Sequence, residues 1–189
     1  DHRDLHSFPP RRSSDLLIEH HTIANTVHDL MPVYEQVSKT TLYTSYVFDV
    51  SVFEVFTSLL TGSTLHVLAD SIRLNVQALS DYLIAESIEL CYVPPVLLKD
   101  LPVIEYPDLR YLLYAGEPCD AVTAAKWSGR VVLWNYYGPT EASICVSKEI
   151  KEAEVNLIGK PIRNTKAYVL DQYLNPVPVG VGEIGRAHV

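Results

Sequence analysis

The chain has 189 residues, 48% of them hydrophobic and 20% charged, which is enough for one globular domain with a sizeable core. Its formal net charge of −8 argues against a nucleic-acid partner, and no apolar run approaches the roughly 18 residues of a membrane helix. Its three cysteines, Cys91, Cys119 and Cys145, are far apart and form no CxxC pair, which excludes a disulfide framework or zinc site and predicts a cytoplasmic protein.

The first half of the packed region is predicted to alternate helices and strands. Apolar spacing and β-branched runs predict a helix over 20–31, a strand over 41–47, a helix over 51–60, a strand over 64–68 and a helix over 75–87. Ser51 followed three residues later by Glu54 is typical of a capping box, and Gly62 is expected to end that helix.

The second half continues the alternation. It is predicted to contain strands over 90–93, 111–114 and 131–134, a helix over 121–127, and antiparallel strands over 166–170 and from 178 onward, around a turn at 171–175. Strands that are apolar on both faces and alternate with helices predict an α/β fold: a mostly parallel sheet covered by helices, with the start of an antiparallel β region near the C-terminus.

The two ends of the chain are predicted to be foreign to the domain. FPPRRSSDL within residues 1–16 and EIGRAHV at 183–189 resemble translations of a sequencing adaptor, which leaves 17–182 as the domain; natural tails are the alternative. Gly180, Gly182 and Gly185 spell the GxGxxG dinucleotide fingerprint, but prolines precede it where a strand is needed. We therefore reject a dinucleotide-binding oxidoreductase.

The strand over 131–134 runs into unusual polar residues, and ligands of parallel sheets bind beyond the carboxyl ends of the strands. Glu141 could hold a magnesium ion, and the Thr140 hydroxyl could donate to a phosphate oxygen. Tyr137 offers a flat face on which a nucleobase could stack, and Asn135 could bind the edge of a base. The alternative is a simple turn followed by a helix cap.

Asp49 is a second candidate, because it lies between Phe48 and Val50 in an otherwise apolar stretch. A buried carboxylate is costly unless it is paired, so such an aspartate would suit the ammonium group of a ligand. The alternative is that Asp49 only helps to cap the helix that follows it.

Three stretches occur in a characteristic order: FDVSVFEVFTSLLTG at 48–62, NYYGPTE at 135–141 and IGKPIRNTKAYVLDQYLNPVPVGV at 158–181. Together they closely resemble the adenylation domains of nonribosomal peptide synthetases, in the superfamily of AMP-forming adenylating enzymes. The resemblance spans about 17–182 and implies part of the large N-terminal adenylation subdomain. It implies activation of an amino acid by ATP and Mg²⁺, then transfer to the phosphopantetheine thiol of a carrier protein, beside condensation domains of the same synthetase.

The resemblance also implies residue roles. Asp49 would bind the substrate ammonium, Thr140 the α-phosphate and Glu141 the magnesium ion, while Tyr137 would stack on adenine with Asn135 and Gly116 at the edge of the base. The side-chain pocket would be lined by Val50, Phe53, Tyr92, Leu113, Ala115, Tyr136, Ile144 and Cys145. None of these pocket residues is charged, so we expect a small to medium apolar amino acid, alanine first.

The chain departs from the family pattern at both ends. The phosphate loop expected before Leu17 is replaced by adaptor-like sequence, and the ribose-binding aspartate and the lysine-bearing C-terminal subdomain are absent. We therefore expect the 189-residue chain alone to be inactive. Two alternatives remain: an acyl- or aryl-CoA ligase of the same superfamily, which would have no use for Asp49, and a noncatalytic ligand-binding remnant.

Overall fold

The computed structural model describes residues 17–139, 142–151, 157–171, 173 and 175–178. The elements in chain order are α1 (His20–Tyr34), β1 (Lys39–Leu42), α2 (Asp49–Thr61), β2 (Thr64–Val67), α3 (Asp70–Arg73), α4 (Val76–Ala85), β3 (Leu90–Tyr92), α5 (Pro95–Leu98), β4 (Tyr111–Ala115), α6 (Ala121–Ser128), β5 (Val132–Tyr137), β6 (Val146–Glu149) and β7 (Lys160–Pro161).

The strands form one seven-stranded sheet in the order β2-β1-β3-β4-β5-β6-β7. Strand pairs from β2 to β5 are parallel, whereas the β5–β6 and β6–β7 pairs are antiparallel. The predicted α/β fold, with a mostly parallel sheet and an antiparallel region toward the C-terminus, is thereby confirmed.

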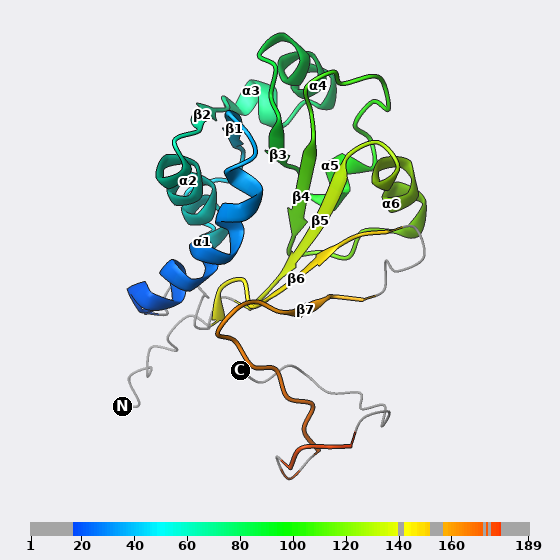
Figure 1. Ribbon diagram of the computed structural model, residues 1–189. Coiled ribbons are helices and arrows are strands. Elements are labelled where there is room, and N and C mark those ends of the chain that lie inside the picture. Colours follow the sequence, from blue (N-terminus) through cyan, green and yellow to red (C-terminus); the bar gives the residue numbers. More distant parts are fainter. Residues whose placement is uncertain (1–16, 140–141, 152–156, 172, 174, 179–189) are drawn as a thin grey trace, which may run out of the picture.

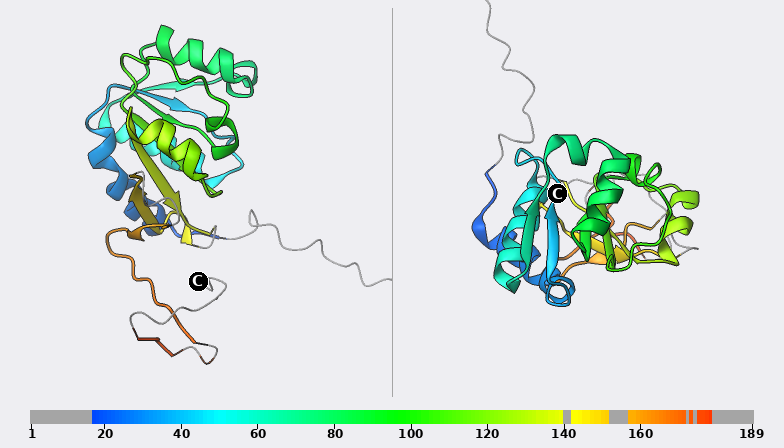
Figure 2. Two further views of the ribbon diagram at one scale, coloured as in Figure 1. Left: turned by 90° about the vertical axis from the view of Figure 1, so that its right-hand side faces the viewer. Right: turned by 90° about the horizontal axis from the view of Figure 1, so that it is seen from above.

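Helices cover both faces of the sheet. Helices α1 and α2 lie together on one side, and α5 and α6 lie on the other (Figures 1 and 2). On the α6 side Trp127 is fully buried and donates its indole N–H to the Leu98 carbonyl of α5 at 3.2 Å. Between the layers, Leu112 and Leu133 of the central strands are completely buried, so apolar burial on both faces holds the sheet.

The predicted strand over 41–47 is wrong in its second half, because the chain leaves the sheet after Leu42. The backbone amides of Tyr43 and Thr44, which would continue a strand, donate to the Glu54 carboxylate, each at 3.0 Å. The capping box is wrong for the same reason. Helix α2 begins at Asp49, its N-cap Phe48 receives no side-chain cap, and Glu54 bonds to the strand exit. Gly62, in the left-handed region at φ 77°, ends α2 as expected.

The antiparallel region also differs in place from its prediction. The described residues of 166–178 contain no strand, only an isolated antiparallel bridge between Leu170 and Pro176. The Asp171 side chain closes the predicted turn by accepting from the amides of Tyr173 and Asn175. The predicted strand from 178 onward lies outside the described residues beyond Pro178. The antiparallel strands that the structure describes are β6 and β7. Strand β5 extends to Tyr137, three residues beyond its predicted end at 134, and its last residue pairs with Val146 of β6.

The remaining helices agree more closely with their predictions. Helix α1 continues past its predicted end through Pro32 to Tyr34. Helix α4 is capped by Asn75, whose side chain accepts from two amides of the first turn. The short helices α3 and α5 were not predicted, because a single turn leaves no readable apolar period.

Candidate functional site

An apolar cavity lies between helices α1 and α2 and the sheet. Its lining consists of Leu30, Tyr34, Val50, Phe53, Glu54, Tyr92, Leu113, Ala115, Tyr136 and Ile144. The structure therefore brings together every predicted pocket residue except Cys145. The cavity volume is about 20 Å³, which is room for about one water molecule.

Strand register explains which side chains reach this cavity. Alternate residues of a strand point to the same face, so Leu113 and Ala115 of β4 share the face toward α1 and α2. Tyr92 of β3 pairs with Leu113, and Tyr136 of β5 pairs with Ala115. Four predicted residues from three strands thus form one continuous wall.

Cys145 lies just outside the cavity. Its amide donates to the Tyr137 carbonyl at 3.0 Å, and its thiol lies 3.6 Å from the same oxygen. Burial raises the pKa of the thiol, which keeps it in the neutral form at neutral pH. The neighbouring Ile144 is in the cavity wall and anchors the segment there.

Asp49 is the first residue of α2 and is half-buried beside Val50, which lines the cavity. Burial raises the pKa of its carboxyl group, and no described basic side chain forms an ion pair with it. Backbone amides at the start of α2 favour its charged form, and a half-buried carboxylate without an ion-pair partner can bind a ligand cation.

The tip of β5 carries the predicted nucleotide-binding residues. Asn135 pairs in register with Tyr114 of β4, and Tyr137 is the last residue of β5 and remains partly exposed. Gly116 follows β4 with φ at +84°, and a Cβ there would meet nothing within 4 Å, so the space beside this backbone is open. The open space and the accessible ring fit a planar ligand approaching the strand ends.

The predicted phosphate and metal residues, Thr140 and Glu141, lie outside the described residues. The chain is tightly packed at Gly138, shortly before them in the sequence. A Cβ on Gly138 would lie 1.5 Å from the Ser143 carbonyl oxygen, so only glycine fits there. Among the described residues, no group of three or more His, Cys, Asp or Glu side chains could hold a metal ion.

Glu54 was missed as a cavity residue. It is only 2% exposed, and each of its carboxylate oxygens accepts one backbone amide from the exit of β1. Burial raises the pKa of Glu54 to about 7, although those amides favour its charged form. The available sequence signal was the spacing of Glu54, Thr57 and Ser58, which share a helix face that is buried against the sheet.

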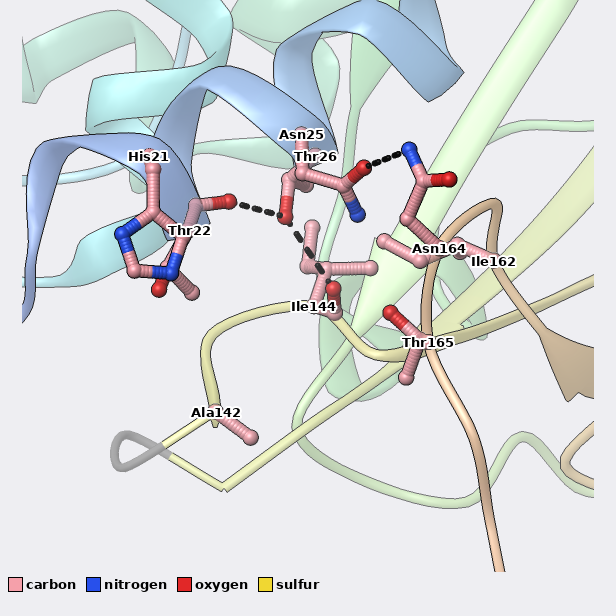
Figure 3. Close-up of a pocket in the computed structure, with 9 residues that line it drawn as sticks. All are labelled: His21, Thr22, Asn25, Thr26, Ala142, Ile144, Ile162, Asn164 and Thr165. Atoms are coloured by element: carbon pink, nitrogen blue, oxygen red, sulfur yellow. Dashed lines mark hydrogen bonds between the residues drawn. The ribbon is translucent and has the colours of Figure 1, made fainter.

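A second, larger cavity of about 350 Å³ shares Ile144 with the first in its lining (Figure 3). Polar residues of α1 face the segment 162–165 across it. The Thr26 hydroxyl donates to the Ile144 carbonyl at 3.1 Å, and the Asn164 amide donates to Asn25 at 2.9 Å. Its wall includes Ala142, the residue that follows Glu141 in the sequence.

No helix among the described residues is both long and apolar enough to cross a membrane.

Comparison with known proteins gives a consistent picture. The family described as AMP-binding enzyme matches residues 16–186. Bacitracin synthase 3 of Bacillus licheniformis is 35% identical over 173 residues, covering 89% of this chain and 3% of that protein. Tyrocidine synthase 1 of Brevibacillus parabrevis is 33% identical over 187 residues, covering 90% of this chain and 17% of that protein.

A solved structure shares the fold. The amide bond synthetase McbA from Marinactinospora thermotolerans superposes with a TM-score of 0.74 at 18% sequence identity, covering 85% of this chain and 34% of that chain. The chain spans only a small part of the curated relatives it matches and about a third of this structural neighbour.

Proposed function

The chain belongs to the family of AMP-binding enzymes, and on that premise we propose that it is part of an adenylation domain that activates an amino acid in nonribosomal peptide synthesis. The observation that carries the proposal is the cavity. Residues from 30 to 144 converge on one apolar cavity, and Val50 in its lining directly follows Asp49, a half-buried carboxylate. A substrate with an ammonium group beside an apolar side chain has the matching chemistry.

In the proposed reaction, the carboxylate oxygen of the amino acid attacks the α-phosphorus of ATP. The bond from that phosphorus to the bridging oxygen breaks, pyrophosphate leaves, and an aminoacyl-adenylate remains. A phosphopantetheine thiol on a carrier protein then attacks the acyl carbon, and AMP leaves. The protein's task is to hold two anions together, which requires fixed donors and a metal ion near the phosphates.

The residue roles are part of the proposal. Asp49 binds the ammonium group, Tyr137 stacks on adenine, and Asn135 and Gly116 contact the edge of the base. Thr140 donates to the α-phosphate, and Glu141 would hold the magnesium ion, which supplies positive charge to the phosphates. Support comes from the open space beside Gly116.

We propose a small apolar amino acid as the substrate, alanine first, with Cys145 bordering the pocket rather than lining it. The void of about 20 Å³ favours a short side chain. Glu54 adds a charged group to a wall that was expected to have none, which disfavours acidic substrates. Its oxygens already accept two amides, and a lysine-sized side chain has no room to reach them.

The experiment needs a complete enzyme. Residues 17–182 would be joined to the flanking coding sequence read outward from the genomic locus, and the product tested in amino-acid-dependent ATP–pyrophosphate exchange. We expect exchange with alanine or another short apolar amino acid and none with Asp, Glu, Lys or Arg. We expect Asp49→Asn to raise the amino-acid KM at least about a hundredfold, because it removes a charge-assisted contact. The matched control is Asp70→Asn at the exposed start of α3.

Two outcomes would contradict the proposal. Activity with carboxylic acids that lack an amino group, with coenzyme A as acceptor, would assign the chain to the acyl- or aryl-CoA ligases. A locus that encodes residues 1–16 and 183–189 as written, followed by a stop codon, would indicate a noncatalytic remnant and overturn the proposal that these segments are foreign. Exchange by the purified 189-residue chain would contradict our proposal that it is inactive alone.

A further inference from the structure

We propose that Glu54 is a positioning residue for the ammonium site: its carboxylate holds the turn over residues 43–48 in the conformation that places Asp49 beside the apolar cavity. The inference rests on the proposed function, in which Asp49 binds the substrate ammonium. Glu54 itself contacts the backbone of this turn, and we assign it no contact with the substrate.

Hydrogen bonds hold both ends of the turn, at the carboxylate and at the start of α2. Its Oε1 accepts the Tyr43 amide and its Oε2 the Thr44 amide, both at 3.0 Å. Within the turn, the Phe48 amide donates to the Ser45 carbonyl at 3.0 Å. The Phe48 carbonyl in turn accepts from the helix, so the residue immediately before Asp49 is bonded on both sides.

The turn is fixed at its start and exposed in its second half. The Tyr43 side chain is only 5% exposed, and its hydroxyl donates to the Arg73 carbonyl at 2.8 Å. Tyr46 is 89% exposed, Val47 62% and Phe48 63%, so none of these three side chains anchors the segment in the core. Beside the buried Tyr43 ring, the two amide bonds to Glu54 hold the backbone at the N-terminal end of the turn.

Burying Glu54 costs desolvation free energy that an apolar side chain of similar size would not cost. Four titratable groups on neighbouring elements interact with Glu54: Tyr34 of α1, Tyr43 after β1, and Cys91 and Tyr92 of β3. Burial raises the pKa of each of them, so all are neutral near pH 7 and none supplies a counter-charge. Hydrogen bonds from Tyr43 and Thr44 stabilise the carboxylate, at a site where an apolar side chain would avoid the desolvation cost.

Protonation of Glu54 weakens the anchor in a defined way. A carboxylate offers an acceptor oxygen to each amide, whereas a neutral carboxyl group offers one carbonyl oxygen and a hydroxyl that donates. One of the two amides then loses its charge-assisted partner. Glu54→Gln reproduces this state at every pH, because its NH2 group faces one of the amide donors.

The first test uses amide NMR of the ¹⁵N-labelled 189-residue chain between pH 5.5 and 8.5 and needs no ligand. In an Asp49→Asn background, which removes the titration of residue 49 itself, we expect the amides of Tyr43, Thr44 and residue 49 to shift with one common midpoint near 7. Adding Glu54→Gln should remove that common titration. A titration confined to Tyr43 and Thr44, with residue 49 unmoved, would overturn the positioning role, as would the absence of any titration.

The second test uses the extended enzyme. Glu54→Gln should raise the amino-acid KM about tenfold while kcat changes less than about threefold, since one amide–carboxylate bond is lost in the ground state of the site. The amino-acid KM of the unmodified enzyme should also rise as the pH falls from 8 to 6, and that rise should be absent in Glu54→Gln.

The matched control is Ser58→Ala, which removes a buried hydroxyl bonded to the Glu54 carbonyl at 2.6 Å and to Thr40 at 2.7 Å. This substitution removes hydrogen bonds of α2 but leaves the Glu54 carboxylate in place. The amino-acid KM of Ser58→Ala should therefore depend on pH as it does in the unmodified enzyme. Equal KM and pH profiles in Glu54→Gln and Ser58→Ala would overturn the proposal. Failure of the proposed function would show instead as no exchange activity in any variant, and the NMR test would still decide the role of Glu54.

Discussion

Glu54→Gln should change how the stability of this domain depends on pH. Burial raises the pKa of Glu54 from 4.5 to about 7 in the folded protein. The folded state therefore binds this proton more tightly than the unfolded state, and Glu54 stabilises the fold fully below pH 4.5, with the contribution lost as the pH rises through 7. With about 1.36 kcal/mol per pKa unit, the contribution falls by about 2.5 kcal/mol between pH 5 and pH 8.

The assay is urea unfolding of the 189-residue chain and of Glu54→Gln at pH 5 and pH 8. Other acids contribute equally to both proteins, so the difference between the two pH dependences isolates Glu54. Between pH 8 and pH 5, we expect the free energy of unfolding of the unmodified chain to rise by about 2.5 kcal/mol more than that of the variant. Equal pH dependences would refute the reasoning, because they would mean that burial does not discriminate against the charged carboxylate.

Three further substitutions test the fold and the strand tip. Trp127→Ala should lower the free energy of unfolding by about 3–5 kcal/mol, because this side chain is fully buried, and Trp127→Phe should lose less; denaturant unfolding measures both. Asn75→Ala should cost about 1 kcal/mol in the same assay by removing the cap of two amides in α4, and a loss below about 0.3 kcal/mol would contradict the capping role. Gly138→Ala should abolish exchange activity in the extended enzyme, since the added Cβ would lie 1.5 Å from the Ser143 carbonyl. Gly129→Ala, where a Cβ meets nothing within 4 Å, is its control and should remain active.

The pattern of apolar strands and intervening helices was readable along the chain because each element carries its own periodicity. The strand around Leu112 is buried on both faces, so its sequence is apolar without interruption and its position could be predicted closely. The cavity residues were predicted by resemblance to a family. The structure adds the reason they meet, which is the register that pairs Tyr92 with Leu113 and Ala115 with Tyr136.

The antiparallel strands could not be located in the same way. Strand β6 reads VSKE and β7 only KP, so neither has an apolar run or a readable alternation. They are strands because β5 offers them an edge, with Tyr137 paired to Val146 and Val146 in turn to Pro161. Pairing between distant segments is a tertiary property, and it also lengthened β5 beyond its predicted end.

Glu54 shows the difference between what the local sequence predicts and what the tertiary structure decides. The sequence by itself determined that an acidic residue follows Ser51 by three positions, and the local pattern favoured a helix cap. Only the tertiary structure decided that the same carboxylate binds the amides of Tyr43 and Thr44. Those amides lie ten and eleven residues away and come within reach because α2 packs across the end of β1. A local cap and a long-range bond use the same side chain, and burial against the sheet favours the bond that leaves no backbone amide unsatisfied.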